Sequence, residues 1–430
     1  MKNITTFQKS INKKSFSRGW IIVIACMLIQ AIPFSVASNI QPQFISYVIK
    51  GDGFTLTAFS LIFTIGTLAS AIASPLIGYI YSKVNVKLFF LIGCIISGAG
   101  FASFSLAKNL WQFYLIAAIV QIGTTIFSSI GIPLIINSWF NKEVRGKALS
   151  LAFAGGSIGN IVLQILVVNS LMSYGFRETY FKYGVISLIV GVPITLFLLK
   201  LPDKDTISIK EKSSSKTNKL DKSNGFSFKE LIKMKIFWIF SIGYVFIGLA
   251  IAALSIQYPN YLKILIKNSS AFIGITPHFI GTIGSLFAIF SLLGNLLGGI
   301  LFDKIGVTNS LIIAFILSVI SCISLIFTKN SPTLSYVFSI TKGLSVYSYM
   351  MGPAYLTSHF FGKKNFTTIL GITNLMFAIG FSVGSTFFAI IVNKLGYTAA
   401  WSFILLFIII AFSALIFADI SVTKTKKSFN

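Results

Sequence analysis

Charged residues are scarce in this sequence of 430 residues. Only 10% of the residues are charged, whereas 55% are hydrophobic and the mean hydropathy is +0.86. A soluble globular domain carries about 25% charged residues, because its surface must face water. The composition therefore argues against a soluble protein and predicts a chain whose surface lies in lipid.

Histidine, cysteine and acidic residues are also few: two His, three Cys and ten Asp or Glu. All three cysteines lie in apolar runs, so neither a disulfide framework nor a metal site is expected. Every acidic residue is expected in a loop or tail, which argues against a proton relay through buried carboxylates. General acid–base chemistry lacks its usual groups, and no nucleotide-binding motif occurs. We therefore expect a protein that is not an enzyme and needs no cofactor or metal.

Apolar runs of about 20 residues, the length of a membrane-spanning helix, recur along the whole chain. The spans must be helical, because backbone groups in lipid have to be satisfied within each segment. The first run is too long for the core of a signal peptide and is read as an uncleaved helix. Twelve helices are predicted, near 20–40, 55–81, 88–107, 111–138, 147–171, 179–200, 236–258, 277–302, 308–327, 333–357, 366–392 and 397–418.

Composition and charge divide the chain into five parts. These are a cytoplasmic tail (1–18), a six-helix bundle (19–200), a basic cytoplasmic linker (201–235), a second six-helix bundle (236–418) and a cytoplasmic tail (419–430). Of the 35 Lys and Arg, 26 fall in the tails, the linker and the loops on the same side, eight fall in the other loops, and Lys342 falls within a span. This asymmetry follows the positive-inside rule and predicts a multi-pass protein of the cell membrane with both termini in the cytoplasm. It also accounts for the net charge of +25 without a nucleic acid partner.

The chain contains an internal repeat. Gly299 minus Gly78 is 221, and the same shift carries Lys83 onto Lys304 and Gly175 onto Gly396. A constant offset across such landmarks indicates two copies of one unit. In membrane proteins, repeats of this kind are typical of transporters whose site lies between the two halves.

The repeated loops resemble those of the major facilitator superfamily, which have a G-x-x-x-D-K-x-G pattern after helices 2 and 8. The second copy carries this pattern in full, at Gly299, Asp303, Lys304 and Gly306. The first copy is degenerate: it keeps Gly78 and Lys83 but has Ser82 in place of the acid. The resemblance implies an all-α fold of twelve transmembrane helices in two pseudo-symmetric six-helix bundles. It also implies a gate in which Asp303 approaches the start of helix 5, near Arg145.

Shorter stretches resemble the oxalate/formate antiporter and monocarboxylate branch of this superfamily. They are Gly19-Trp20, the connection from Trp139 to Ala148, and Gly175-Phe176-Arg177. Oxalate-exchanging members are expected to carry basic residues in helices 8 and 11, whereas the predicted helices 277–302 and 366–392 contain none. The departure favours a substrate with fewer negative charges, or with more apolar surface, than oxalate.

The candidate substrate site is built around Lys342, since an ionisable residue within a span is costly and is by default a functional candidate. An ammonium group facing a cavity would pair with an organic anion, although its stem could instead reach the outer surface. Uncharged residues expected to complete the site are Gln30, Gln121, Tyr347 and Asn374. Each of the amides could also serve only as a hydrogen-bonding contact between helices.

The sequence therefore predicts a secondary transporter that moves a small organic anion, monocarboxylate-like or larger and amphipathic, by alternating access and by antiport. Its expected partners are that anion and membrane lipid, with no obligatory protein partner. Two alternatives stay open: a proton-linked or drug-type efflux permease of the same superfamily, and a membrane receptor that does not transport.

Overall fold

The computed structural model describes residues 18–81, 83–140, 142–200, 230, 233–361 and 366–427, and the described chain is helical throughout its spans. The first half begins with one long stretch, Arg18–Asp52, that includes the π-helix η1, the 3-10 helix η2 and the short helix α2. The elements of this half are η1 (Gln30–Asn39), η2 (Gln41–Phe44), α2 (Ile45–Asp52), α3 (Leu56–Tyr81), α4 (Val86–Ser103), η3 (Phe104–Leu106), α5 (Leu110–Thr124), η4 (Thr125–Gly131), α6 (Ile132–Trp139), α7 (Lys142–Pro193) and η5 (Ile194–Leu198).

The second half repeats this pattern, with two differences in where helices break. Its elements are α10 (Lys235–Ile256), α11 (Tyr258–Asn268), η6 (Ser270–Phe272), α12 (His278–Ile305), α13 (Val307–Phe327), η7 (Thr328–Asn330), α14 (Thr333–Leu344), α15 (Tyr347–Met350), α16 (Gly352–Phe361) and α17 (Phe366–Lys427). The seventh predicted helix, 236–258, corresponds to α10, and a further short helix that was not predicted, α11, follows it after Gln257. The tenth is divided among α14, α15 and α16.

Two of the long elements are pairs of membrane helices. α7 contains Gly175 with φ of 76°, and α17 contains Gly396 with φ of 82°, both in the left-handed region that favours glycine. These glycines are 221 residues apart and make the turns between helices 5 and 6 and between helices 11 and 12. Nine described helical stretches are long and apolar enough to cross a membrane. Dividing α7 and α17 and adding the broken helix 10 accounts for the twelve predicted spans.

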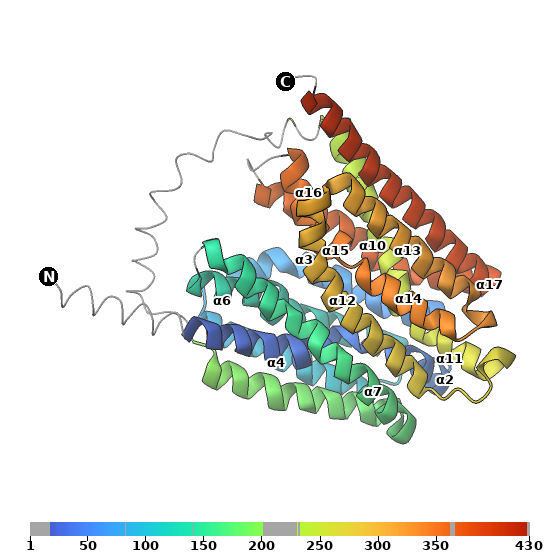
Figure 1. Ribbon diagram of the computed structural model, residues 1–430. Coiled ribbons are helices and arrows are strands. Elements are labelled where there is room, and N and C mark those ends of the chain that lie inside the picture. The colour runs from blue at the N-terminus through green and yellow to red at the C-terminus, as the bar shows by residue number, and fades with distance from the viewer. Residues whose placement is uncertain are drawn as a thin grey trace.

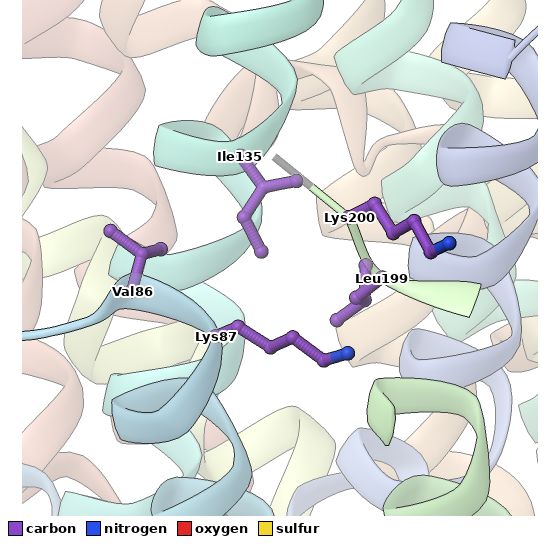
Figure 2. Close-up of a pocket in the computed structure, with 5 residues that line it drawn as sticks. All are labelled: Val86, Lys87, Ile135, Leu199 and Lys200. Carbon is purple, nitrogen blue, oxygen red and sulfur yellow. The ribbon is translucent and has the colours of Figure 1, made fainter. Parts of the chain in front are cut away.

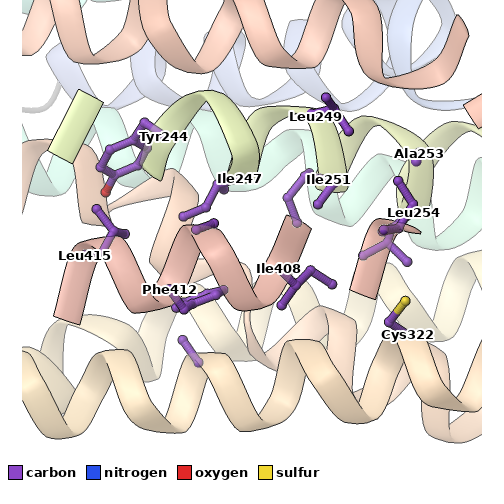
Figure 3. Packing of buried hydrophobic residues seen from close by; sticks show 14 of the residues in the cluster. Tyr244, Ile247, Leu249, Ile251, Ala253, Leu254, Cys322, Ile408, Phe412 and Leu415 are labelled. Carbon is purple, nitrogen blue, oxygen red and sulfur yellow. The ribbon is translucent and has the colours of Figure 1, made fainter. Parts of the chain in front are cut away.

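The termini of the described chain define the two sides of the protein. The near side is the side on which Arg18 and Lys427 lie, and the far side is the opposite one. Figure 1 shows that the halves meet near α2 and α11 on the far side, and that α6 and α16 lie apart on the near side. The second bundle has an aromatic and aliphatic core in which α10 packs along α17. Tyr244, Ile247 and Ile251 of α10 face Ile408 and Phe412 there (Figure 3).

The last helix differs from its predicted boundary at residue 418. α17 continues to Lys427, and Asp419, which was expected in a tail, is only 2% exposed. The Asp419 carboxylate accepts a hydrogen bond from Thr308 on α13 and lies 3.4 Å from His359 Nε2 on α16. The expectation that every acidic residue lies in a loop or tail was therefore wrong. These contacts compensate the burial of the carboxylate on the near side, and hydropathy alone does not reveal them.

Candidate functional site

The two bundles are joined on the far side by a symmetric pair of hydrogen bonds. Thr64 on α3 donates to the carbonyl oxygen of Ser382 on α17, and Ser285 on α12 donates to the carbonyl oxygen of Ile161 on α7. Adding 221 to Thr64 and Ile161 gives Ser285 and Ser382. The same bond is thus made twice, once at each of the two seams between the halves.

Further hydrogen bonds surround this pair on the far side. Gln257 Nε2 donates to Ser60 Oγ at 3.0 Å and to Ser385 Oγ at 2.8 Å, and so connects helices 7, 2 and 11. Asn393 Nδ2 donates to Thr57 Oγ1 at 2.8 Å. These contacts lie within the far half of the bundles, so the far side is closed in this conformation.

The near side is different. A Cβ atom added at Gly78 on α3 or at Gly371 on α17 would meet no heavy atom within 4 Å. Asp303 is exposed and accepts a hydrogen bond at 3.2 Å from Tyr355, a residue of its own bundle. Among the described residues, no hydrogen bond or ion pair joins the two bundles on this side. The two bundles make the contacts described above on the far side and lie apart at α6 and α16 on the near side (Figure 1), which we call the open side.

The predicted gating residues that the structure describes lie on the open near side. In this conformation their positions do not show whether Asp303 binds the start of helix 5. Lys304 and Lys83 are exposed, and Lys83 Nζ lies 5.8 Å from the centroid of the Tyr79 ring. Gly299 faces Met351 of its own bundle, with 3.5 Å between an added Cβ and Met351 Cε. Ser82 and the side chain of Arg145 lie outside the described residues. The approach of Asp303 to the start of helix 5 stays a prediction.

Lys342 lies inside the second bundle, between helices 7, 8 and 10. Its side chain is 1% exposed, and Nζ donates to Ser255 Oγ at 2.9 Å. Nζ also lies 3.9 Å from the centroid of the Phe287 ring, with the Phe338 and Tyr258 rings at 5.6 and 5.7 Å. Aromatic faces attract a cation, but no described carboxylate lies within ion-pair distance of Nζ. The ammonium group is thus held by a hydroxyl and ring faces alone.

Gln121 occupies the position in the first bundle that Lys342 occupies in the second, since 342 minus 121 is 221. Their neighbours on helices 2 and 8 are related in the same way. Gly66 packs on Gln121, with 2.8 Å between an added Cβ and Gln121 Cγ, where Phe287 packs on Lys342. The repeat therefore places an uncharged amide in one bundle at the position of the buried cation in the other.

The other three predicted site residues lie apart from Lys342. Gln30 is buried in the first bundle and donates from Nε2 to Ser128 Oγ at 2.8 Å. Tyr347 is also buried; its hydroxyl donates to the Ser310 carbonyl oxygen at 2.7 Å, within the second bundle. Asn374 is exposed on α17, three helical turns before Ser385. Among the described residues, no hydrogen bond, ion pair or cation–ring contact joins any of these three to Lys342.

Sequence reasoning missed Ser255, Phe287 and Tyr258, which surround Lys342. A serine and two aromatic residues in apolar helices carry no signal by themselves, and only the rotation of each helix brings them to the lysine. A small pocket elsewhere is lined by Val86, Lys87, Ile135, Leu199 and Lys200 (Figure 2). It belongs to the first bundle alone, where Lys87 Nζ donates to the Leu196 carbonyl oxygen at 2.6 Å.

Comparison with known proteins identifies relatives of one kind. The family model described as Major Facilitator Superfamily matches residues 20–274 and 265–429. The sialic acid transporter NanX of Escherichia coli (strain K12) is 24% identical over 293 residues, which are 67% of each chain. Monocarboxylate transporter 12 of Mus musculus is 21% identical over 434 residues, covering 95% of this chain and 86% of that protein.

A solved structure shares the fold. The bacterial homologue of the human lysosomal transporter Spinster, in an inward-facing and unoccupied conformation, superposes with a TM-score of 0.73 at 15% sequence identity. The match covers 95% of this chain and 98% of that one. At this identity the likeness concerns the fold and not the substrate.

Proposed function

Because this chain belongs to the major facilitator superfamily, and is therefore a multi-pass membrane transporter of organic substrates rather than an enzyme, we propose that it carries a small organic anion by alternating access. The anion is monocarboxylate-like or larger and amphipathic. The mode of transport is the exchange of one anion for another. The protein acts in the cell membrane with both termini in the cytoplasm, so that the open near side faces the cytoplasm.

The observation that carries this proposal is the environment of Lys342. A buried ammonium group ordinarily has a carboxylate partner, since an unpaired charge in low dielectric is costly. Nζ of Lys342 instead has one serine hydroxyl and the face of Phe287. An incoming carboxylate would supply the missing negative charge, and charge-assisted hydrogen bonds are the stronger kind.

The pseudo-symmetry suggests different roles for Lys342 and Gln121 in substrate binding. Lys342 and Gln121 sit at equivalent depths of the two bundles, on either side of the place where transporters built from repeats bind their substrates. We assign recognition of the anionic group to Lys342 and orientation of the remainder to Gln121. Gln30 and Asn374 take contributory roles in this assignment, whereas the contacts of Tyr347 with Ser310 give it a structural one.

Exchange follows from the charge of the empty carrier. Without an anion, the site would change sides with an ammonium group that has no counterion; with an anion, it changes sides with that charge paired. The second route avoids most of the electrostatic cost of an unpaired buried charge. Loaded carriers should therefore interconvert faster than empty ones, which is the kinetic property of an exchanger.

The test is anion exchange in proteoliposomes. Radiolabelled monocarboxylates and sialic acid are loaded inside, and efflux is measured with and without unlabelled anion outside. Lys342→Gln should abolish exchange, whereas Lys329→Gln, an exposed lysine of the same bundle, should leave it unchanged. If vesicles with wild-type protein release the labelled anion equally fast with and without external anion, exchange is refuted. Accumulation of the anion driven by a pH gradient alone would favour the proton-linked alternative.

Orientation is tested separately. Residues 201–235 are proposed to lie in the cytoplasm between the bundles 19–200 and 236–418. An impermeant thiol reagent applied to intact cells should therefore fail to label Ser214→Cys. Efficient labelling from outside would reverse the assignment of both sides.

A further inference from the structure

The far side carries an excess of positive charge. Its loops and helix ends hold eight Lys and Arg but only two acids, Asp52 and Glu178. Each acid is already bound: Arg177 lies 2.7 Å from Asp52, and Lys182 lies 2.8 Å from Glu178. The remaining far-side cations have no carboxylate within ion-pair distance among the described residues; they are Lys50, Lys108, Lys263, Lys267, Lys329 and Lys394. A surface with this charge raises the local concentration of anions.

Two of these lysines come from opposite bundles and meet where the far side closes. α11 of the second bundle contacts α2 of the first. Lys263 on α11 extends its Nζ to 2.7 Å from the centroid of the Tyr47 ring on α2. Lys50 follows Tyr47 by three residues, so that it lies one helical turn along the same face of α2. The closed far side thus places the Lys263 ammonium group over Tyr47, near enough to Lys50 for the two positive charges to repel each other.

This arrangement works against closure when no anion is present. Lys263 is half-buried, whereas Lys50 is exposed. Burial, and secondarily the charge of Lys50, lower the pKa of Lys263 to about 7. Asp52 is two residues from Lys50, but its Oδ1 is held by Arg177, which also donates to the carbonyl oxygens of Ser105 and Ala107. Among the described residues, neither lysine has a carboxylate within ion-pair distance.

We propose that Lys50 and Lys263 form an anion-binding station at the far mouth, which takes a carboxylate or a similar small oxyanion and is assembled when the two bundles close there. The bound anion accepts hydrogen bonds from both ammonium groups and bridges the bundles. It replaces a repulsion across the closed mouth with two attractions. The station would hold the substrate where it enters or leaves the far side, and would make closure there depend on an anion.

This inference rests on the proposed function for the class of its ligand, but its test measures conformation and not transport. Leu106, 76% exposed in the first bundle, and Ile273, 84% exposed in the second, are replaced by cysteine and spin-labelled. The three native cysteines are buried and leave these positions selective. Electron–electron double resonance then gives the fraction of molecules in which the far side is closed.

Sodium acetate is the probe, titrated against sodium chloride at constant ionic strength. It should raise the ratio of closed to open molecules about two- to fivefold, the effect expected of a surface ion pair. The increase should disappear in Lys263→Gln and in Lys50→Gln, and should persist in the control Lys329→Gln. If Lys263→Gln does not fold, Lys50→Gln alone provides the test, because Lys50 is exposed and its replacement should not affect folding.

A second comparison separates this station from the central site. In Lys342→Gln the response to acetate should be unchanged. Lys342 lies between helices 7, 8 and 10 and contacts neither Lys50 nor Lys263 among the described residues. Loss of the response in that variant, its persistence in Lys263→Gln, or its absence from the wild-type protein would each overturn the proposal. A carrier that responds to acetate but exchanges no anion would refute the proposed function and leave the station intact.

Discussion

Closure of the far side should depend on pH, because it changes the surroundings of Lys263. In the closed state burial lowers the pKa of Lys263 to about 7. When the bundles separate, α11 leaves α2, the ammonium group regains water, and its pKa returns to about 10.4. At a pH between these two pKa values, closure of the far side therefore releases a proton from Lys263. The closed state is favoured above pH 10, loses stability as pH falls toward 7, and changes no further below 7.

The size of the effect follows from the two pKa values. One proton gives at most about a tenfold change in the ratio of closed to open molecules per pH unit. Between pH 7.5 and 9 the full shift predicts an increase of about 20-fold, and a shift halved by solvent screening of the half-buried lysine predicts about 3-fold. The tyrosines around this contact are Tyr47, Tyr258 and Tyr261, and a phenol ordinarily titrates near pH 10, above the range of the assay.

The assay is the distance distribution between spin labels at Leu106→Cys and Ile273→Cys, measured in chloride buffer at pH 7.5, 8.2 and 9. The short-distance fraction should rise with pH in the wild-type protein. Lys263→Gln should show no such rise, because glutamine does not titrate. A wild-type response that is flat or reversed, or an equal rise in Lys263→Gln, would show that this lysine does not sense closure.

Three further outcomes are expected. Gly159→Ala should destabilise the protein by about 1–3 kcal/mol or more, because an added Cβ would lie 1.8 Å from the Ala31 carbonyl oxygen, whereas Gly78→Ala, with no atom within 4 Å, should not; thermal unfolding in detergent measures both. Arg177→Ala should cost about 1–3 kcal/mol by the same measurement, since it leaves Asp52 without its partner, and Lys182→Ala, which breaks an exposed pair, should cost less. Asp303→Asn should slow exchange more than Ser82→Ala and shift molecules toward the open near side, because only the carboxylate can form a charged latch with the positive end of helix 5; equal rates would count against this asymmetry.

The helical architecture was predictable from hydropathy and from the shift of 221 residues. The runs of apolar residues gave the spans, and Gly175 and Gly396 marked two of the turns between them. The break in helix 10 and the short helix α11 after helix 7 were not visible in the same pattern. Ser345 interrupts a run that continues on both sides, and α11, which follows Gln257, is much less apolar than α10, so hydropathy placed the end of the span there but did not reveal a further helix.

The candidate site was predictable only in part. A lysine within an apolar run is conspicuous, so Lys342 could be chosen without a structure. The direction of its side chain depends on the rotation of helix 10 against helices 7 and 8, and the sequence does not specify that rotation. The contact of the buried Asp419 with the partly exposed His359 escaped notice for a similar reason, since the two residues are 60 positions apart in the sequence.

The internal repeat distinguishes structural contacts, which occur in both bundles, from several charged residues, which occur in only one. Thr64 and Ser285 donate the same hydrogen bond at the two seams, and Gly175 and Gly396 make the same turn. Such equivalence suits a scaffold whose halves must rock against each other symmetrically.

Some charged residues repeat, as Lys83 and Lys304 do, but three charges with proposed functional roles do not. Lys342 corresponds to Gln121, Asp303 to Ser82, and Lys263 to Pro42. In each of these three pairs the second bundle carries the charge and the first carries an uncharged residue. A symmetric scaffold that carries these charges in one bundle can open alternately to either face, and the proposed anion would meet the charges of a single bundle. We therefore expect substitutions at repeated positions to impair movement between states for every substrate, and substitutions at these unrepeated charges to change which anions are carried and how strongly.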